Sequence, residues 1–167
     1  QEPLSSLPLW SFGAAAALAE CFGLYLKWPN DVITQEGLKV AGILTEAEIR
    51  DQHCDFLLMG VGLNVQQQVF PDWLPQASSL SLIYGPQNIE DVAQKAIAAI
   101  LEGAAHPARL SRWRKRALTL GRYLQVETPQ GIIEGIAEEL TEQGALRVGG
   151  QLIWSGTVIK QLPCDHL

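Results

Sequence analysis

The pattern of the sequence changes near Ala117. Before this point, runs with helical spacing alternate with strand-like runs. After it, short runs of β-forming residues are separated by glycines roughly every ten residues. Turns at that interval are typical of a small antiparallel barrel. We therefore expect an α+β protein in which residues 1–117 form a mixed sheet with packed helices and residues 118–162 form the barrel.

The first 117 residues contain patterns for three helices and four strands. The Ala-rich run 11–22, closed by Gly23, predicts a helix that packs tightly against a sheet. The apolar spacing over 89–101 predicts a helix with Asn88 as its N-cap, and another helix is expected over 109–118. Strands are predicted over 24–28, 32–34, 38–49 and 55–65. The last strand is apolar on both faces, which is typical of a buried central strand.

The composition excludes several classes of protein. Of the 167 residues, 47% are hydrophobic, which is too many for a disordered chain. No apolar run reaches the ~18 residues that a membrane-spanning helix needs. A net charge of −6 argues against a general nucleic-acid binder. The three cysteines are scattered and show no C-x-x-C spacing, so we expect neither disulfides nor a cysteine zinc site, and we predict a reducing cytoplasmic location.

The beginning of the sequence is unusual for a translation product. The chain starts with Gln1, and its only methionine is Met59. Nothing in it resembles a signal peptide, because no basic stretch precedes a short apolar run. We therefore expect the chain to begin inside a longer reading frame.

Three clusters place polar groups within or at the end of apolar strands: 27–31 (Lys-Trp-Pro-Asn-Asp), 39–44 (Lys-Val-Ala-Gly-Ile-Leu) and 60–65 (Gly-Val-Gly-Leu-Asn-Val). A lysine in such a place must reach solvent or meet an anion. Glycines inside an apolar strand indicate a bulge or the close approach of another group, such as a ligand. Taken singly, each cluster also has an ordinary structural explanation as a strand-end lysine or a turn.

Together, the order, the separation and the residue identities of these clusters resemble those of the catalytic core of the biotin protein ligases. The segment Ala77-Ser78-Ser79-Leu80 resembles the family sequence after the third cluster, and residues 120–158 resemble the family's C-terminal SH3-like barrel. The resemblance covers nearly the whole chain. It implies a class II synthetase-like sheet with packed helices, followed by that barrel.

The resemblance also implies a two-step ligation. Biotin condenses with ATP to give biotinyl-5′-AMP, and biotin is then transferred to a lysine of a biotin carboxyl carrier protein. A carboxylate must attack an α-phosphate that is itself negative, so both groups need cationic partners, including Mg²⁺. Edge-to-edge sheet dimers occur in the family, so a homodimer stays open as a further partner.

Roles for individual residues follow from the matching family positions. Lys39 is the candidate catalytic residue, placed between the carboxylate of biotin and the α-phosphate. Asp31 and Asn64 match positions that hold Mg²⁺. The nucleotide would contact Gly62, Leu63 and Asn64. The residues expected to bind or shape the biotin site are Lys39, Gly42, Leu44, Trp28 and Asn30.

One family feature has no counterpart in this sequence. The family carries a Gly-Arg-rich loop several tens of residues before the Lys-Trp-Pro-Asn-Asp motif, and no Gly-Arg-Gly-Arg-like run occurs here. Without that loop, water would reach the mixed anhydride, so we expect this chain alone to be inactive or impaired. Two alternatives stay open. The chain could be a non-catalytic remnant that binds a carrier or partner protein, or a relative of the lipoate-attaching enzymes.

A basic run lies along the last predicted helix of the first part and just after it. Its members make up half of the 12 Lys and Arg residues, and they are Arg109, Arg112, Arg114, Lys115, Arg116 and Arg122. Such a run could contact phosphates or an acidic carrier protein. The interpretation we favour is a solvated helix face beside the junction with the barrel.

Overall fold

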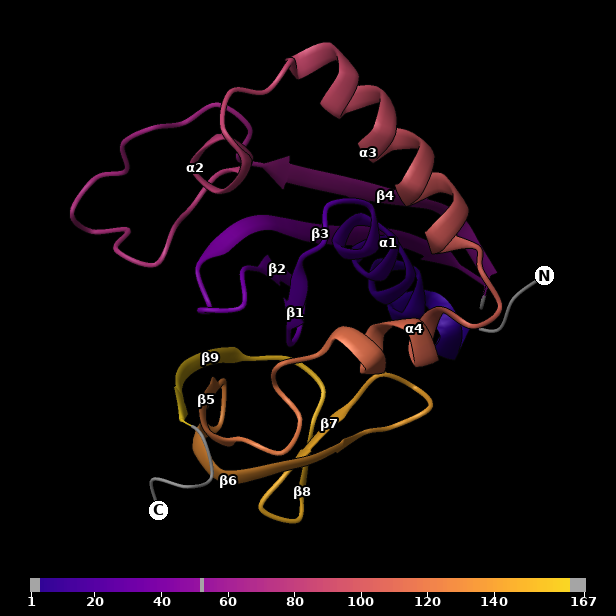
Figure 1. Cartoon of the computed structure of the whole chain (residues 1–167). Coiled ribbons are helices and arrows are strands. Elements are labelled where there is room, and N and C mark those ends of the chain that lie inside the picture. The colour runs from indigo at the N-terminus through magenta and orange to yellow at the C-terminus, as the bar shows by residue number, and fades with distance from the viewer. Residues whose placement is uncertain (1–3, 52, 163–167) are drawn as a thin grey trace.

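The computed structural model describes residues 4–51 and 53–162, and these residues form two antiparallel sheets (Figure 1). The N-terminal sheet has the spatial order β1-β2-β3-β4, with β1 (Tyr25–Lys27), β2 (Asp31–Ile33), β3 (Lys39–Arg50) and β4 (His53–Leu63). The C-terminal sheet has the order β8-β7-β6-β5-β9, with β5 (Tyr123–Thr128), β6 (Gly131–Leu140), β7 (Leu146–Val148), β8 (Gln151–Ile153) and β9 (Thr157–Leu162). The predicted α+β class is confirmed.

The strands of both sheets pair antiparallel throughout. We predicted a mixed sheet for the first part of the chain. None of the described strands pairs with another in parallel. Two isolated parallel bridges, Leu26–Ala117 and Lys39–Ala77, instead link a strand residue to a residue outside the strands. Short turns join β1 to β2, β2 to β3 and β3 to β4, and such turns connect antiparallel neighbours.

The described residues form five helices. They are the short 3₁₀ helix η1 (Leu4–Ser6), α1 (Leu7–Cys21), α2 (Leu80–Tyr84), α3 (Ile89–Ala104) and α4 (Arg109–Arg116). Of these, α1 packs directly on the N-terminal sheet. Helix α1 begins four residues before its predicted start, because Pro8 lies in the first turn, where a missing N–H costs nothing. None of the described helices has both the length and the apolar character of a membrane-spanning segment.

Helix α1 lies at the centre of the packing, against the sheet on one side and against α3 and α4 on the other (Figure 1). Its small residues allow this. A methyl group on Gly13 would lie 2.2 Å from the carbonyl oxygen of Gly103, so the two helices cross at backbone contact. Phe12 then meets Trp113 of α4 edge to face, with the ring centres 5.2 Å apart. The same core cluster continues into the C-terminal sheet through Leu124 and Leu146.

The basic side chains of α4 are tied to their surroundings. Arg112 pairs with Glu20 of α1 at 2.5 Å and with Glu102 of α3 at 2.9 Å. Its hydrogen bond lowers the pKa of the Glu20 carboxyl, against the opposing effect of burial. Arg114 donates to the carbonyl oxygen of Leu140 in the C-terminal sheet. The interpretation of this run as a solvated face was therefore wrong for these arginines, which join α4 to its neighbours.

Strand β4 differs from its prediction. The sequence predicted a buried central strand, but among the described strands β4 pairs with β3 alone and forms the edge of the N-terminal sheet. Met59, Val61 and Leu63 pack on the core, whereas Phe56 and Leu58 on the other face are 55% and 60% exposed. An apolar run shows that both faces of a strand are hydrophobic, but it does not show that other residues cover both faces.

Candidate functional site

One row of directly opposed residues crosses all four strands of the N-terminal sheet. Lys27 on β1 lies opposite Asp31 on β2, Asp31 lies opposite Gly42 on β3, and Gly42 lies opposite Gly62 on β4. Directly opposed residues of an antiparallel sheet share a face. A single carboxylate therefore has a lysine on one side and two positions without side chains on the other.

Asp31 holds two lysines. Its Oδ1 lies 2.5 Å from Lys39 Nζ, and its Oδ2 lies 3.3 Å from Lys27 Nζ. The carboxylate is buried, and a buried charge must be compensated by a partner of opposite sign. The Lys39 side chain is half exposed, whereas that of Lys27 is only 20% exposed. The two lysines therefore differ in their freedom to move.

Gly42 makes the contact between Lys39 and Asp31 possible. A methyl group at this position would lie 3.2 Å from both Cε and Nζ of Lys39 and 3.8 Å from Asp31 Oδ1. The lysine side chain thus folds across the bare backbone of Gly42 to reach the carboxylate. Here the sequence indicated close approach of another group, and in this structure the approaching group is the lysine of the same motif.

Asn64 follows the end of β4, and the hydrogen bonds around it hold it firmly. Its backbone N–H donates to Val40 O at 2.9 Å, and its own carbonyl accepts from Leu80 N at 3.0 Å. The side-chain Nδ2 donates to Ser78 O at 2.9 Å. This bond uses the donor end of the amide, so Oδ1 is the atom that can face a ligand.

Lys39, Gly42, Gly62, Leu63 and Asn64 line one pocket of about 460 Å³. Its remaining walls include Phe70, Leu74 and Ala77 from the loop after β4. The floor is open, because a methyl group on Gly62 would touch none of the described residues. Five of the residues predicted for the site thus share a pocket, and Asp31 joins them through its contact with Lys39.

The other predicted residues lie elsewhere. Trp28, Asn30 and Leu44 line a second, mostly apolar pocket of about 480 Å³ that reaches Trp154 of the C-terminal sheet region. Trp28 is only 1% exposed, and the carbonyl of Asn30 accepts from Ile43 N at 3.0 Å. Leu44 is exposed and lies opposite Gly60, two residues along β3 from Gly42.

Comparisons with known proteins bear on this arrangement. No family model matches the sequence. The chain is 37% identical over 139 residues to the biotin–[acetyl-CoA-carboxylase] ligase of Mycobacterium tuberculosis, covering 77% of this chain and 49% of that protein. It is 31% identical over 161 residues to the bifunctional ligase/repressor BirA of Bacillus subtilis, covering 86% and 49%. The structure of the biotin protein ligase from Aquifex aeolicus in complex with biotin and ATP matches with a TM-score of 0.72 and 28% identity, covering 93% of this chain and 71% of that one.

The chain belongs to the biotin protein ligase family. The resemblance inferred from the three motif clusters is thereby confirmed. The chain spans about half the length of the curated relatives that it matches. The structural match covers nearly all of this chain, including both sheets, and family membership favours the biotin ligases over the lipoate-attaching enzymes.

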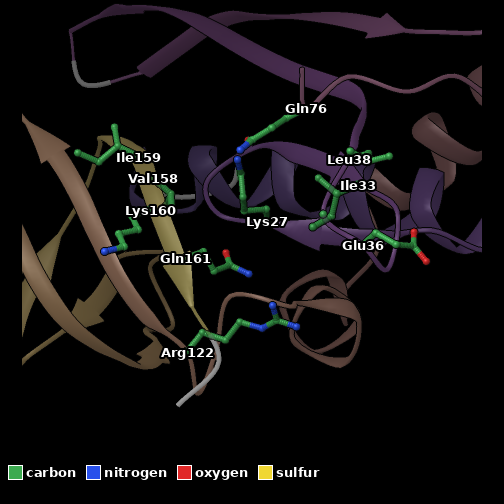
Figure 2. Close-up of a pocket in the computed structure, with 11 residues that line it drawn as sticks. Lys27, Ile33, Glu36, Leu38, Gln76, Arg122, Val158, Ile159, Lys160 and Gln161 are labelled. Atoms are coloured by element: carbon green, nitrogen blue, oxygen red, sulfur yellow. The ribbon is translucent and has the colours of Figure 1, made fainter. Parts of the chain in front are cut away.

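A third pocket in this biotin ligase relative was not predicted from the sequence. It has a volume of about 300 Å³ and lies between the N-terminal sheet and β9. Figure 2 shows Lys27, Arg122 and Gln161 around the same space, and Lys160 also lines it. Arg122 and Lys160 are far from Lys27 in the sequence, and no local pattern links them. Only the arrangement of the two sheets brings these cations to the pocket that Lys27 also lines.

Proposed function

We propose that this chain carries the biotin- and ATP-binding core of a biotin–protein ligase. Such an enzyme activates biotin with ATP to biotinyl-5′-AMP and transfers biotin to a lysine of a biotin carboxyl carrier protein. The observation that carries the proposal is the contact of Lys39 Nζ with Asp31 Oδ1 at 2.5 Å. This contact lies beside a pocket that is lined by Gly42, Gly62 and Asn64. We further propose that residues 1–117 form the ligase core and that residues 118–162 form a separate SH3-like barrel.

The first step joins two anions. An oxygen of the biotin carboxylate attacks the α-phosphorus of ATP, and the bond from that phosphorus to the bridging oxygen breaks, so that pyrophosphate leaves. Lys39 is placed to lower the repulsion between these groups, because its ammonium lies at the edge of the pocket and is half exposed. Its contact with Asp31 holds it in place until the substrates arrive.

Biotin and the nucleotide need different surfaces. The side-chain-free strip formed by Gly42, Gly60 and Gly62, with Leu44 beside it, suits an apolar acyl chain that lies flat on the sheet. We assign Gly42 and Leu44 to the acyl chain and carboxylate of biotin. Gly62, Leu63 and Asn64 we assign to the nucleotide. Trp28 and Asn30 we place in the turn that presents Asp31.

The donor set suits Mg²⁺ in a particular way. The described residues contain no group of three or more acidic, histidine or cysteine side chains that could hold a metal alone. Asp31 Oδ1 is paired with the half-exposed ammonium of Lys39, which has room to move away, and Asn64 has its Oδ1 to spare. One carboxylate and one amide oxygen fit a cation whose other ligands are phosphates and water. When bound there, Mg²⁺ would neutralise phosphate charge, and Asp31 and Asn64 would hold it.

The second step transfers biotin to the carrier. The amine of the carrier lysine attacks the acyl carbon of the adenylate, the carbon–oxygen bond to AMP breaks, and the amine loses a proton. The face of the N-terminal sheet that carries the glycine strip is exposed, which leaves room for a carrier to approach. A cytoplasmic location, where such carriers are made, stays a prediction.

The test is biotin-dependent exchange of labelled pyrophosphate into ATP, followed by a streptavidin blot of a carrier protein, with the variants made in a form of the protein whose parent shows exchange. Lys39→Ala should abolish exchange, whereas Lys95→Ala, which removes an exposed lysine of α3, should leave it unchanged. Circular dichroism should show the same fold for both variants. Exchange at the parental rate by Lys39→Ala would refute the role of this lysine. Binding of biotin can be measured even where the chain does not catalyse the exchange. Calorimetry with biotin on the same samples therefore tests the alternative that the chain is a non-catalytic remnant.

A further inference from the structure

The turn that presents Asp31 is held from outside the N-terminal sheet. Residues 28–30 form the turn between β1 and β2, and the two residues that flank it, Lys27 and Asp31, pair with each other. Any displacement of this turn therefore changes the spacing of the two charges. The contacts that fix the turn thus bear directly on the proposed site.

Two of these contacts come from the C-terminal part of the chain. The backbone N–H of Trp28 donates to Thr119 Oγ1 at 2.9 Å, and both residues are almost fully buried. The indole Nε1 of Trp28 donates to the carbonyl of Gly144 through a longer bond of 3.5 Å. A buried N–H that loses its acceptor has no water to replace it, so the Thr119 contact is the stronger constraint.

Gly144 is itself placed by packing. It adopts a φ of +89°, and a methyl group there would lie 2.6 Å from Cε2 of Phe12. Arg114 of α4 also donates to the carbonyl of Leu140, just before this turn. The β6–β7 connection is thus fitted between α1 and α4, and it presents its carbonyl to Trp28.

The segment before β5 continues the N-terminal sheet. Leu118 N donates to Leu26 O at 2.8 Å, and Leu26 forms a parallel bridge with Ala117. The outer edge of β1 is thereby covered by the segment that leads into the C-terminal sheet. Lys27 and Trp28 follow immediately, so the same segment holds both the strand and the turn.

We propose that Thr119 and Gly144 are positioning residues of the Asp31 site and act through Trp28. They fix the β1–β2 turn so that Asp31 can face Lys27 and Lys39 at once. The C-terminal sheet region then has a part in the activation chemistry without touching a substrate. This inference rests on the proposed function for its catalytic consequence, but its structural content is independent of that function.

The first experiment needs no activity. The chain has five lysines and five tryptophans, and their ammonium and indole groups give separate signals in ¹⁵N-labelled protein. Thr119→Val keeps the shape of the side chain and removes the acceptor. It should shift the signals of Lys27, Lys39 and the Trp28 indole by more than a linewidth, while Thr119→Ser restores them. Thr157→Val, an exposed change of the same kind on β9, should leave all three in place.

The second experiment measures the consequence for catalysis. In biotin-dependent pyrophosphate exchange, Thr119→Val should lower kcat about tenfold while the KM for biotin changes less than about twofold, because a small misplacement of charge affects the chemical step. Unchanged lysine signals in a folded Thr119→Val protein would overturn the inference. If that variant does not fold, Trp28→Phe removes the indole donor together with part of the buried ring, keeps the backbone N–H that bonds to Thr119, and must shift the same lysine signals. A parent that responds in the spectra yet neither exchanges pyrophosphate nor binds biotin in calorimetry would instead contradict the proposed function.

Discussion

Gly42→Ala should change the geometry of the site while leaving the stability of the fold nearly unchanged. The new methyl group would lie 3.2 Å from Cε and Nζ of Lys39, a few tenths of an ångström closer than ordinary contact. The neighbour that must yield is the end of a flexible, half-exposed side chain. The strain is therefore relieved by moving the ammonium, and moving it weakens the contact with Asp31.

Gly42→Ala has two opposing effects on the stability of the fold, whereas its effect on activity is a loss. Loss of a partly exposed ion pair costs about 0.2–1 kcal/mol, and replacing glycine with alanine at a compatible backbone position returns about 0.4–1 kcal/mol by restricting the unfolded chain. The free energy of unfolding should therefore change by less than about 1 kcal/mol. Displacing a group that meets two reacting anions should lower kcat/KM for biotin by about tenfold to a hundredfold.

Urea unfolding and pyrophosphate exchange measure the two quantities. Gly62→Ala is the matched control, because a methyl group there touches none of the described residues. It should leave the lysine signals of the free protein unchanged and affect only ligand binding, whereas Gly42→Ala should shift the Lys39 signal without any ligand. If Gly42→Ala unfolds at much lower urea, or leaves both the Lys39 signal and the exchange rate unchanged, the reasoning is refuted.

Two further predictions concern the packing around α1. The Arg112 bond lowers the pKa of Glu20 below 4.5, so its stabilising effect is complete above that pH and is lost as the pH falls through the folded-state pKa. Glu20→Gln should thus lower the free energy of unfolding by about 1 kcal/mol at pH 7, and the difference from the parent in urea titrations should shrink as the pH falls through the folded-state pKa. Gly13→Ala should destabilise by about 2 kcal/mol or more in the same assay, although alanine favours helix, because its methyl would lie 2.2 Å from Gly103 O. A pH-independent effect of Glu20→Gln, or a stabilised Gly13→Ala, would contradict these arguments.

Much of the site could be predicted because its parts are local in the sequence. The turn after Lys27 and the short hairpin before Lys39 set the pairing of β1, β2 and β3, and pairing decides which residues face each other. The glycines of β3 and β4 indicated an open backbone, and the structure places Gly42 opposite Gly62. The roles of these residues toward biotin, nucleotide and Mg²⁺ stay predictions.

The parts that could not be predicted depend on contacts between distant segments. Trp28 and Gly144 are 116 positions apart, and no pattern near either residue indicates that they meet. Trp28 was expected to bind or shape the biotin site, which stays a prediction, and its indole also bonds to the C-terminal part of the chain. Likewise, the arginines of α4 are closely spaced, as on a solvated helix face, but the partners of Arg112 and Arg114 lie on α1, on α3 and at the end of β6.

The two lysines on Asp31 have different consequences for the chemistry. A buried carboxylate needs at least one cation beside it, and Lys27, which is mostly covered and lies directly opposite on β1, can meet that need alone. Lys39 is therefore the lysine that can leave Asp31 without stranding a charge, and its greater exposure gives it the room to do so. With both lysines present, the cluster has a net charge of +1 at the end of an open glycine floor. This excess positive charge attracts an anion to the place where Lys39 leaves Asp31. Joining a carboxylate to a phosphate requires such a positive charge, because both groups are negative.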